Sequence, residues 1–305
     1  SLVGSEMCIR DSLIMFIIGG ILIYLAIDKE YEPSLLLPIG FGAIISNIPL
    51  SSAVGDGGFL TILYKAGIAT ELFPVLIFIG VGAMIDFKPL IASPFMLFFG
   101  AAAQFGIFAT MLFAISTGKF SLPEAASIGI IGAADGPTSI YVAKVFAPNY
   151  LGPISVAAYS YMSLVPIIQP PVIKLLTTSK ERKIRMKYTT VHVPKKVEIL
   201  FPIVITVIAG IIAPMSVSLI GALMFGNLIR VCGVLERLSI SAQNELSNLV
   251  TILLGITIGG TMSADAFLNV NTLMILAMGL VAFIFDTAGG VLFAKFLNLF
   301  LKNKV

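Results

Sequence analysis

The sequence predicts an all-α polytopic membrane protein made of two related repeats with interrupted helices. Of its 305 residues, 58% are apolar and only 11% are charged, whereas a soluble domain usually carries about 25% charged residues. Apolar stretches recur along the chain, and several are interrupted by Gly and Pro. A water-soluble core of this length would not absorb so many large apolar side chains. We therefore expect a multi-pass protein of the inner (cytoplasmic) cell membrane, with the lipid bilayer around it.

The apolar stretches divide the chain into about ten membrane segments, several shorter than the roughly 20 residues that a straight crossing needs. Residues 59–69 and 230–246 carry polar and apolar side chains together and are expected to lie at the membrane interface. The expected membrane segments are residues 13–27, 35–50, 72–85, 95–116, 123–145, 151–172, 199–213, 216–228, 249–262 and 272–297.

Polar stretches set the predicted domain boundaries. Residues 1–12 have no hydrophobic pattern and no signal-peptide organisation, so we predict that they are foreign to the fold or disordered. Eight of the 19 Lys and Arg residues lie between Lys174 and Lys196, which predicts a cytoplasmic loop by the positive-inside rule. Apolar segments on both sides of this loop argue against nucleic acid as its partner. The predicted domains are a first transmembrane repeat at 13–173, the basic loop at 174–198 and a second repeat at 199–305.

The two predicted repeats share blocks in the same order. PSLLLPIGFGAIISN at 33–47 resembles PMSVSLIGALMFGN at 214–227, and ELFPVLIFIGVGAM at 71–84 resembles ELSNLVTILLGITIGGTM at 245–262. Chance similarity among Gly-rich apolar helices is the alternative. Repeats with interrupted segments are typical of transporters that bind near the membrane midplane. Adding the offset of about 180 residues to Asp135 gives a position beyond the last residue, so we expect the second repeat to be incomplete at its C-terminal end.

The stretch SIGIIGAADGPTSIYVAKV carries the strongest chemical signal. An acid at the bilayer centre costs roughly 2.5–3.5 kcal/mol on insertion scales, so Asp135 requires a reason to be there. Gly136 allows unusual backbone angles and Pro137 lacks an amide donor, which predicts a helix split at Asp135. The split exposes carbonyl oxygens beside the carboxylate and the hydroxyls of Thr138 and Ser139, a set of hard oxygen ligands suited to Na⁺ or a proton. A re-entrant turn that Asp135 merely caps is the alternative.

Four further polar residues within apolar segments are weaker candidates. Tyr159 and Tyr161 lie two positions apart on a helix and face different directions, so we expect one to pack and the other to line the pathway. Asp286 would be a second ion ligand or the partner of a basic residue. Gln104 would bind across helices. Two lysines near segment ends are expected to extend to the interface: Lys144 and Lys295.

Three motifs in this order resemble a known family: GAADGPTSIYVAK, VAAYSYMSLVPIIQPP and TTSKERKIRM. They resemble the beta subunit of the biotin-dependent, sodium-translocating decarboxylases, whose complexes act on oxaloacetate, methylmalonyl-CoA, glutaconyl-CoA or malonate. The resemblance covers residues 13–305. It implies a membrane subunit that releases CO₂ from carboxybiotin, takes up a proton from the outer side and exports Na⁺. The implied partners are a biotin carrier that presents the carboxybiotin, a carboxyltransferase and a small membrane subunit.

The resemblance also implies roles for individual residues. The essential aspartate of the family's broken helix falls on Asp135, and the functional tyrosine falls on Tyr161 rather than Tyr159. Asp135 is then expected to bind Na⁺ in exchange for a proton that Tyr161 delivers or orients. The family's second cluster, an Asn, a Gly, a Ser and an Arg in a later broken helix, has no counterpart here, and Asp286 departs from the small or hydroxyl residue expected at its place. The groups expected to complete the site are Gly136, Thr138 and Ser139.

Two other functions fit the residues without the resemblance. A Na⁺-coupled secondary transporter of a small organic anion, which does no chemistry, would use the same repeat and the same broken helix. A structural anchor for a soluble complex would use the basic loop as its docking face. A neighbouring gene for a biotin carrier or a carboxyltransferase would separate the enzyme from the transporter.

Overall fold

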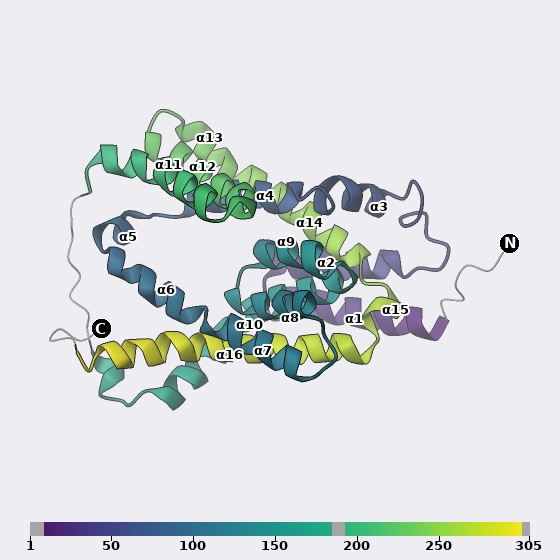
Figure 1. The fold of residues 1–305 in the computed structure, drawn as a ribbon. Coiled ribbons are helices and arrows are strands. Elements are labelled where there is room, and N and C mark those ends of the chain that lie inside the picture. The colour runs from purple at the N-terminus through teal and green to yellow at the C-terminus, as the bar shows by residue number, and fades with distance from the viewer. Residues whose placement is uncertain (1–8, 185–192, 301–305) are drawn as a thin grey trace.

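The computed structural model describes residues 9–184 and 193–300, and every regular element within these ranges is helical (Figure 1). The all-α prediction is confirmed. Part of the predicted basic loop, residues 185–192, lies outside the described residues. The α-helices are α1 (Ile9–Asp28), α2 (Pro33–Ser46), α3 (Phe59–Leu63), α4 (Leu72–Met84), α5 (Lys88–Ala92), α6 (Leu97–Ala103), α7 (Phe105–Ser116), α8 (Leu122–Gly129), α9 (Gly136–Phe146), α10 (Leu151–Leu176), α11 (Lys195–Ile212), α12 (Val217–Cys232), α13 (Glu236–Ser241), α14 (Ser247–Gly260), α15 (Ala264–Phe267) and α16 (Val270–Leu297).

Short π and 3-10 turns adjoin several of these helices. The π turns η1 (Tyr64–Ile68) and η7 (Ala242–Leu246) precede α4 and α14, and the 3-10 turn η3 (Ile130–Ala133) follows α8. Three of the other 3-10 turns begin with proline, whose fixed φ suits the first helical position. These other turns are η2 (Pro94–Met96), η4 (Pro148–Tyr150), η5 (Glu181–Lys183) and η6 (Pro214–Ser216).

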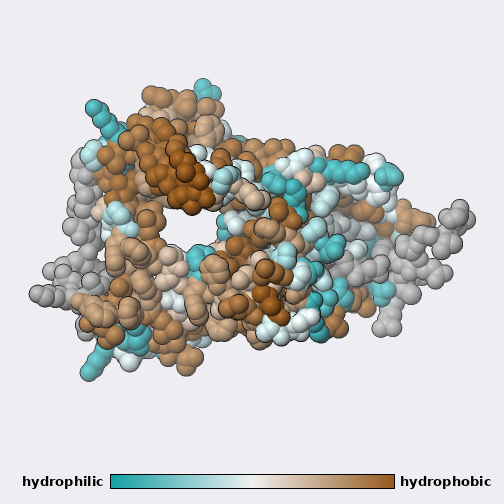
Figure 2. All heavy atoms as spheres, in the orientation of Figure 1, coloured by the Kyte–Doolittle hydropathy of each residue, from teal (hydrophilic) through white to brown (hydrophobic). Residues whose placement is uncertain are grey.

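Several helices have the length and composition of membrane spans. The bent pair Phe59–Ile68 and Leu72–Met84, which turns by 61°, adds one crossing if it counts as a single span. Large apolar side chains are exposed on many helices, and Figure 2 shows them as brown surface over much of the visible face. Contact with lipid accounts for such a surface on a polytopic membrane protein. Within the described ranges, the four helices that are long and apolar enough to cross a membrane are Asp11–Asp28, Pro94–Ser116, Pro214–Cys232 and Val270–Leu297.

The first helix starts earlier than the sequence suggests. α1 begins at Ile9, four residues before the first predicted segment. Ser12 in its first turn is buried, and Asp11 places a negative charge near the positive end of the helix dipole. Residues 9–12, which the sequence predicts to be foreign to the fold or disordered, therefore form the first turn of α1. Residues 1–8 lie outside the described part of the chain.

Two close helix crossings join segments of the two predicted repeats: α2 packs on α14, and α4 packs on α12. A methyl group added at Gly42 of α2 would overlap the Ile256 carbonyl oxygen of α14. One added at Gly82 of α4 would overlap the Leu223 carbonyl oxygen of α12. Small residues allow this backbone contact, which is a common way for helices to associate within membranes.

A buried asparagine secures each crossing. Asn47 Nδ2 donates to the Met262 carbonyl oxygen at 2.7 Å, and Asn47 Oδ1 accepts from Ala264 N at 3.1 Å. Asn227 Nδ2 donates to the Ile85 carbonyl oxygen at 2.9 Å. Each asparagine thus binds the chain just after a helix of the other predicted repeat. Asn47 and Asn227 are also the positions that the sequence repeat aligns, so the crossings support the repeat, which stays a prediction.

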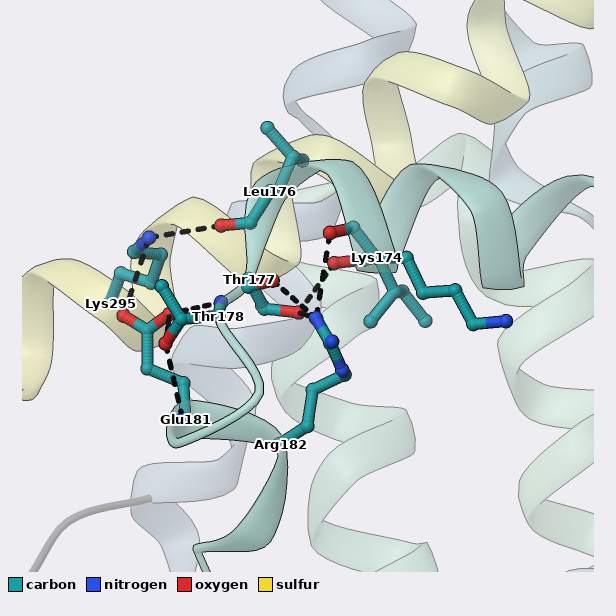
Figure 3. Close-up of polar contacts among 8 residues, drawn as sticks. Lys174, Leu176, Thr177, Thr178, Glu181, Arg182 and Lys295 are labelled. Atoms are coloured by element: carbon teal, nitrogen blue, oxygen red, sulfur yellow. Dashed lines mark hydrogen bonds and ion pairs between the residues drawn. The ribbon is translucent and has the colours of Figure 1, made fainter.

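Two cationic side chains bind the C-terminal end of α10, one from η5 and one from α16 (Figure 3). Arg182 donates to the Thr177 carbonyl oxygen, and Lys295 of α16 donates to the Leu176 carbonyl oxygen at 2.9 Å. These bonds satisfy carbonyl oxygens that have no partner within a helix end. Lys295 also pairs with Glu181 at 3.3 Å. The ammonium group of Lys295 thus binds an acid and a carbonyl oxygen at the end of its segment, and its extension to the interface stays a prediction.

Candidate ion site at a helix break

α8 and α9 form one interrupted helix, and the break lies where the sequence predicts it. After η3, Ala134 has a φ of 54°, in the left-handed region. Asp135 follows in an extended conformation as the N-cap of α9, which opens with Gly136 and Pro137. Proline suits the first turn because the amide that it lacks would have no helical partner there. The helical hydrogen bonding therefore stops before Asp135 and restarts after it.

Asp135 is bonded to the second half of the interrupted helix. Thr138 Oγ1 donates to Asp135 Oδ2. The Ser139 amide and hydroxyl donate to the Asp135 carbonyl oxygen at 3.0 and 2.9 Å. Ser139 is buried, while Asp135 and Thr138 are half-buried. These bonds tie the carboxyl group to α9, so Asp135 follows any movement of that half-helix.

The oxygen atoms at the break suit a hard cation. The Asp135 carboxylate is in contact with the Thr138 hydroxyl, and the break leaves carbonyl oxygens at the end of η3 outside a continuous helical ladder. In the described parts of the chain, no lysine or arginine pairs with Asp135. The carboxylate charge is therefore open to a cation such as Na⁺, and broken helices hold Na⁺ in this way.

Tyr159 of α10 packs directly on the break. Its side chain is 1% exposed, and a methyl group added at Gly136 would overlap its ring and lie 2.7 Å from its hydroxyl oxygen. The phenol is within electrostatic reach of Asp135. Gly136 therefore has a second function besides interrupting the helix, because it makes room for this aromatic ring.

Tyr161 lies against α16 instead. Its hydroxyl donates to the Leu276 carbonyl oxygen at 2.5 Å, and its ring lies 5.9 Å from that of Phe283, centroid to centroid. A methyl group added at Gly279 of α16 would lie 2.8 Å from the Tyr161 ring. The two tyrosines thus face different directions, as the helical spacing predicts. The contacts bring Tyr159 to the break, and the proton role of Tyr161 stays a prediction.

Asp286 of α16 contacts the interrupted helix just before the break. A methyl group added at Gly132 in η3 would lie 2.9 Å from Asp286 Oδ2, and one at Gly106 of α7 would overlap the carboxyl group. Asp286 Oδ1 is buried and faces the backbone of Gly106. Gly132 precedes Asp135 by three residues, so a second acid adjoins the segment that carries the first. Its role as an ion ligand stays a prediction.

Gln104 lies at the junction of α6 and α7 with an exposed side chain. Its backbone amide donates to the Gly100 carbonyl oxygen at 3.2 Å. The predicted binding of its side chain across helices stays a prediction.

One pair of residues near the break escaped the sequence analysis. Lys144 of α9, expected to extend to the interface, pairs with Glu71 at 2.6 Å. Glu71 lies at the bend between η1 and α4, 73 positions earlier in the chain. No periodicity links two residues so far apart, and only the packing of α9 on α4 brings them together.

Comparisons with known proteins add independent information. A family model described as "Na+-transporting oxaloacetate decarboxylase beta subunit" matches residues 11–305. The chain is 48% identical to methylmalonyl-CoA decarboxylase subunit beta of Propionigenium modestum, over 96% of this chain and 80% of that protein. It is 53% identical to glutaconyl-CoA decarboxylase subunit beta of Acidaminococcus fermentans, over 93% and 75%. It is 45% identical to the oxaloacetate decarboxylase beta chain of Klebsiella pneumoniae, over 96% and 81%.

Proposed function

The chain belongs to the family of Na⁺-transporting oxaloacetate decarboxylase beta subunits, and we propose that it decarboxylates carboxybiotin and couples CO₂ release and proton uptake to Na⁺ export. It is a multi-pass protein of the cytoplasmic membrane. Its relatives are named as beta subunits or beta chains of decarboxylases. A biotin carrier, a carboxyltransferase and a small membrane subunit are the proposed partners, and the carboxyltransferase selects the substrate acid.

The observation that carries this proposal is the Asp135–Thr138 contact at a helix break. An acid within a membrane segment costs free energy of insertion, and such acids usually line an ion or substrate pathway. A broken helix places such an acid among backbone and hydroxyl oxygens, which are ligands for Na⁺. A carboxyl group can also bind a proton, which removes its negative charge. The same site therefore binds either Na⁺ or a proton, but not both at once.

The proposed coupling follows from that exchange. Carboxybiotin, held by the partner carrier, supplies the carboxyl group: its N–C bond breaks, CO₂ leaves, and the electron pair left on nitrogen takes up a proton. As a carboxylate, Asp135 holds Na⁺ together with the Thr138 hydroxyl. As a carboxylic acid, Asp135 holds the proton that arrives from the outer side. Proton binding at Asp135 therefore releases Na⁺, and proton transfer onward restores the carboxylate.

In this proposal the two tyrosines have different roles, one in proton transfer and one in packing. Tyr161 delivers or orients the proton, a role a phenol can perform as donor and acceptor. Tyr159 packs on Gly136 and keeps the break closed to bulk water on that side. Gly136 and Ser139 shape the start of α9, and the Ser139 hydroxyl holds the Asp135 carbonyl oxygen.

The test is Na⁺-stimulated decarboxylation of free carboxybiotin by the protein in liposomes, with Na⁺ transport measured in parallel. Asp135→Asn removes the charge and keeps the shape, so both activities should fall at least about 100-fold. The matched control is Asp56→Asn, the same exchange at an exposed acid in the loop before α3, which should leave both unchanged. Retained Na⁺-dependent decarboxylation in Asp135→Asn would overturn the assignment. Na⁺ transport without decarboxylation in the unsubstituted protein would favour a transporter.

A further inference from the structure

The ion pair between Glu71 and Lys144 joins the two interrupted helices of the first half of the chain. Glu71 Oε1 and Lys144 Nζ are 2.6 Å apart, and their side chains are 24% and 27% exposed. A charge-assisted contact of this length is among the stronger polar interactions in proteins, and partial burial limits its screening by salt. The pair therefore constrains how the two helices lie against each other.

Glu71 occupies a special backbone position. It sits at the 61° bend between Phe59–Ile68 and Leu72–Met84, with a φ of 64° in the left-handed region. Its amide donates to the Ile68 carbonyl oxygen at 2.9 Å, which closes the turn. A left-handed conformation is costly for a residue with a Cβ, and glycine adopts it freely. Glutamate at this position therefore contributes through its side chain and not through its backbone preference.

Lys144 lies in the last turn of the half-helix that carries Asp135. The two residues are nine positions apart, which corresponds to about 13 Å along a helix. α9 is short, and its hydrogen bonds to Asp135 make the carboxyl group a part of it. A cation in the last turn also interacts favourably with the helix dipole. A force applied at Lys144 is thus transmitted along α9 to Asp135.

The break makes such an anchor necessary. An uninterrupted helix fixes its two ends through a continuous ladder of hydrogen bonds, and that ladder stops at Ala134 here. The direction of α9 relative to α8 is therefore set by tertiary contacts. At its N-terminal end α9 packs on Tyr159 through Gly136. At its C-terminal end the ion pair to Glu71 is the charged contact.

We propose that Glu71 and Lys144 are positioning residues that hold α9 against the bend before α4 and thereby set the geometry of the Asp135 cation site. This inference rests on the proposed function, because it assigns the pair to Na⁺ binding at Asp135. Neither side chain touches the cation. Breaking the pair lets α9 shift and separates the Asp135 carboxylate from the backbone oxygens of η3, which weakens Na⁺ binding before it affects the chemical step.

The experiment measures the Na⁺ concentration that gives half-maximal decarboxylation of free carboxybiotin in liposomes. Glu71→Gln and Lys144→Gln should each raise that concentration about fivefold or more, with a smaller change in the maximal rate. The exchanged double variant Glu71→Lys/Lys144→Glu restores opposite charges and should return the value to within about twofold of the original. The matched control is Glu181→Gln, which removes a glutamate paired with Lys295 away from both interrupted helices and should leave the value unchanged.

A second readout needs no turnover. Na⁺ binding to the folded protein raises its unfolding temperature, and the Na⁺ concentration for half of that rise should increase in Glu71→Gln by the same factor. A lower unfolding temperature with an unchanged Na⁺ requirement would mean a purely structural pair and would overturn the inference. Failure of the exchanged double variant to recover would also overturn it. If Asp135→Asn abolishes activity while both pair variants keep the original Na⁺ requirement, this inference fails and the proposed function stands.

Discussion

The two interrupted helices of the first half of the chain, α3–η1–α4 and α8–η3–α9, both have a left-handed residue at the break and differ in where they place an acid. In α3–η1–α4 the left-handed residue is the acid itself, Glu71. In α8–η3–α9 the left-handed residue is Ala134, and the acid Asp135 follows it as an extended N-cap. Proline stands within the first turn of both second halves, as Pro74 and Pro137. Both breaks thus share a left-handed residue and a proline in the next turn, although a π turn precedes one and a 3-10 turn the other, and the position of the acid shifts by one residue.

That shift decides whether the acid is free for a cation. A left-handed Glu71 directs its longer side chain to Lys144 at 2.6 Å, so its charge is neutralised within the protein. The extended Asp135 keeps its short side chain at the start of α9, where a neutral donor, the Thr138 hydroxyl, bonds to it. An acid paired with lysine stabilises the arrangement of the helices, whereas an acid bonded only to neutral oxygen groups can bind a cation.

Gly136→Ala is the substitution expected to have the largest effect on activity, and it tests the comparison between the two breaks. The added methyl group would overlap the Tyr159 ring, and Tyr159 has no room to withdraw because it is buried. Overpacking of this kind typically costs about 1–3 kcal/mol, and a shift of the Asp135 carboxylate by about 1 Å would lower activity by roughly 100-fold. The measurements are Na⁺-dependent decarboxylation in liposomes and thermal unfolding of the same preparation.

Gly67→Ala is the matched control on the other interrupted helix. A methyl group there would overlap the Phe73 ring, so the substitution places the same group against a buried aromatic ring. Gly67 and Phe73 flank the bend that carries Glu71 and do not adjoin Asp135, so a change there reaches the cation site only through the Glu71–Lys144 pair. Gly67→Ala should therefore lower the unfolding temperature as Gly136→Ala does and raise the Na⁺ requirement, with a much smaller loss of maximal activity. Equal losses of activity would show that the two breaks are not functionally distinct.

The break itself was predictable, and its surroundings were not. Gly136 and Pro137 act on the local backbone, so a single sequence reveals where the helix stops. The helix ends elsewhere also fell near the expected segments, because Pro and Gly punctuate them. Tyr159 facing Gly136, Asp286 facing Gly132, and Glu71 facing Lys144 are contacts across 23, 154 and 73 positions. Such contacts depend on how helices pack, and apolar membrane helices carry little sequence signal for their partners.

Ala134→Gly should have a smaller effect that isolates the backbone. Ala134 is exposed and has a φ of 54°, so glycine removes the left-handed cost without loss of packing. We expect a gain in stability of up to about 1 kcal/mol, measured by thermal unfolding, with Na⁺-dependent activity retained. Glu71→Gly relieves the same backbone cost but removes the ion pair, so it should raise the Na⁺ requirement. A gain in stability from both, with no change in Na⁺ requirement for either, would remove the distinction between the two breaks.

The smallest expected effect concerns Glu181 of η5, which lies outside both interrupted helices and outside the membrane segments and pairs with Lys295 in the last turn of α16. The Thr178 amide and hydroxyl donate to Glu181 Oε2 at 2.6 and 2.9 Å, and these bonds, with a further contribution from Lys295, lower the pKa of Glu181 below its ordinary value of 4.5. A lowered pKa in the folded state means that the stabilisation is fully present above pH 4.5 and is lost as the pH falls through the lower folded value.

The unfolding temperatures of the protein and of Glu181→Gln should therefore differ by a constant, small amount from neutral pH down to 4.5, and the difference should shrink below that. Because this pair is more exposed than the Glu71–Lys144 pair and is screened by salt, added NaCl should reduce the difference. The partly buried Glu71–Lys144 pair should resist the same salt, because less water and fewer ions reach it. Equal sensitivity of the two pairs to salt would mean that the Glu71–Lys144 pair is as exposed as the Glu181–Lys295 pair, and that it contributes no more than a surface contact to holding α9.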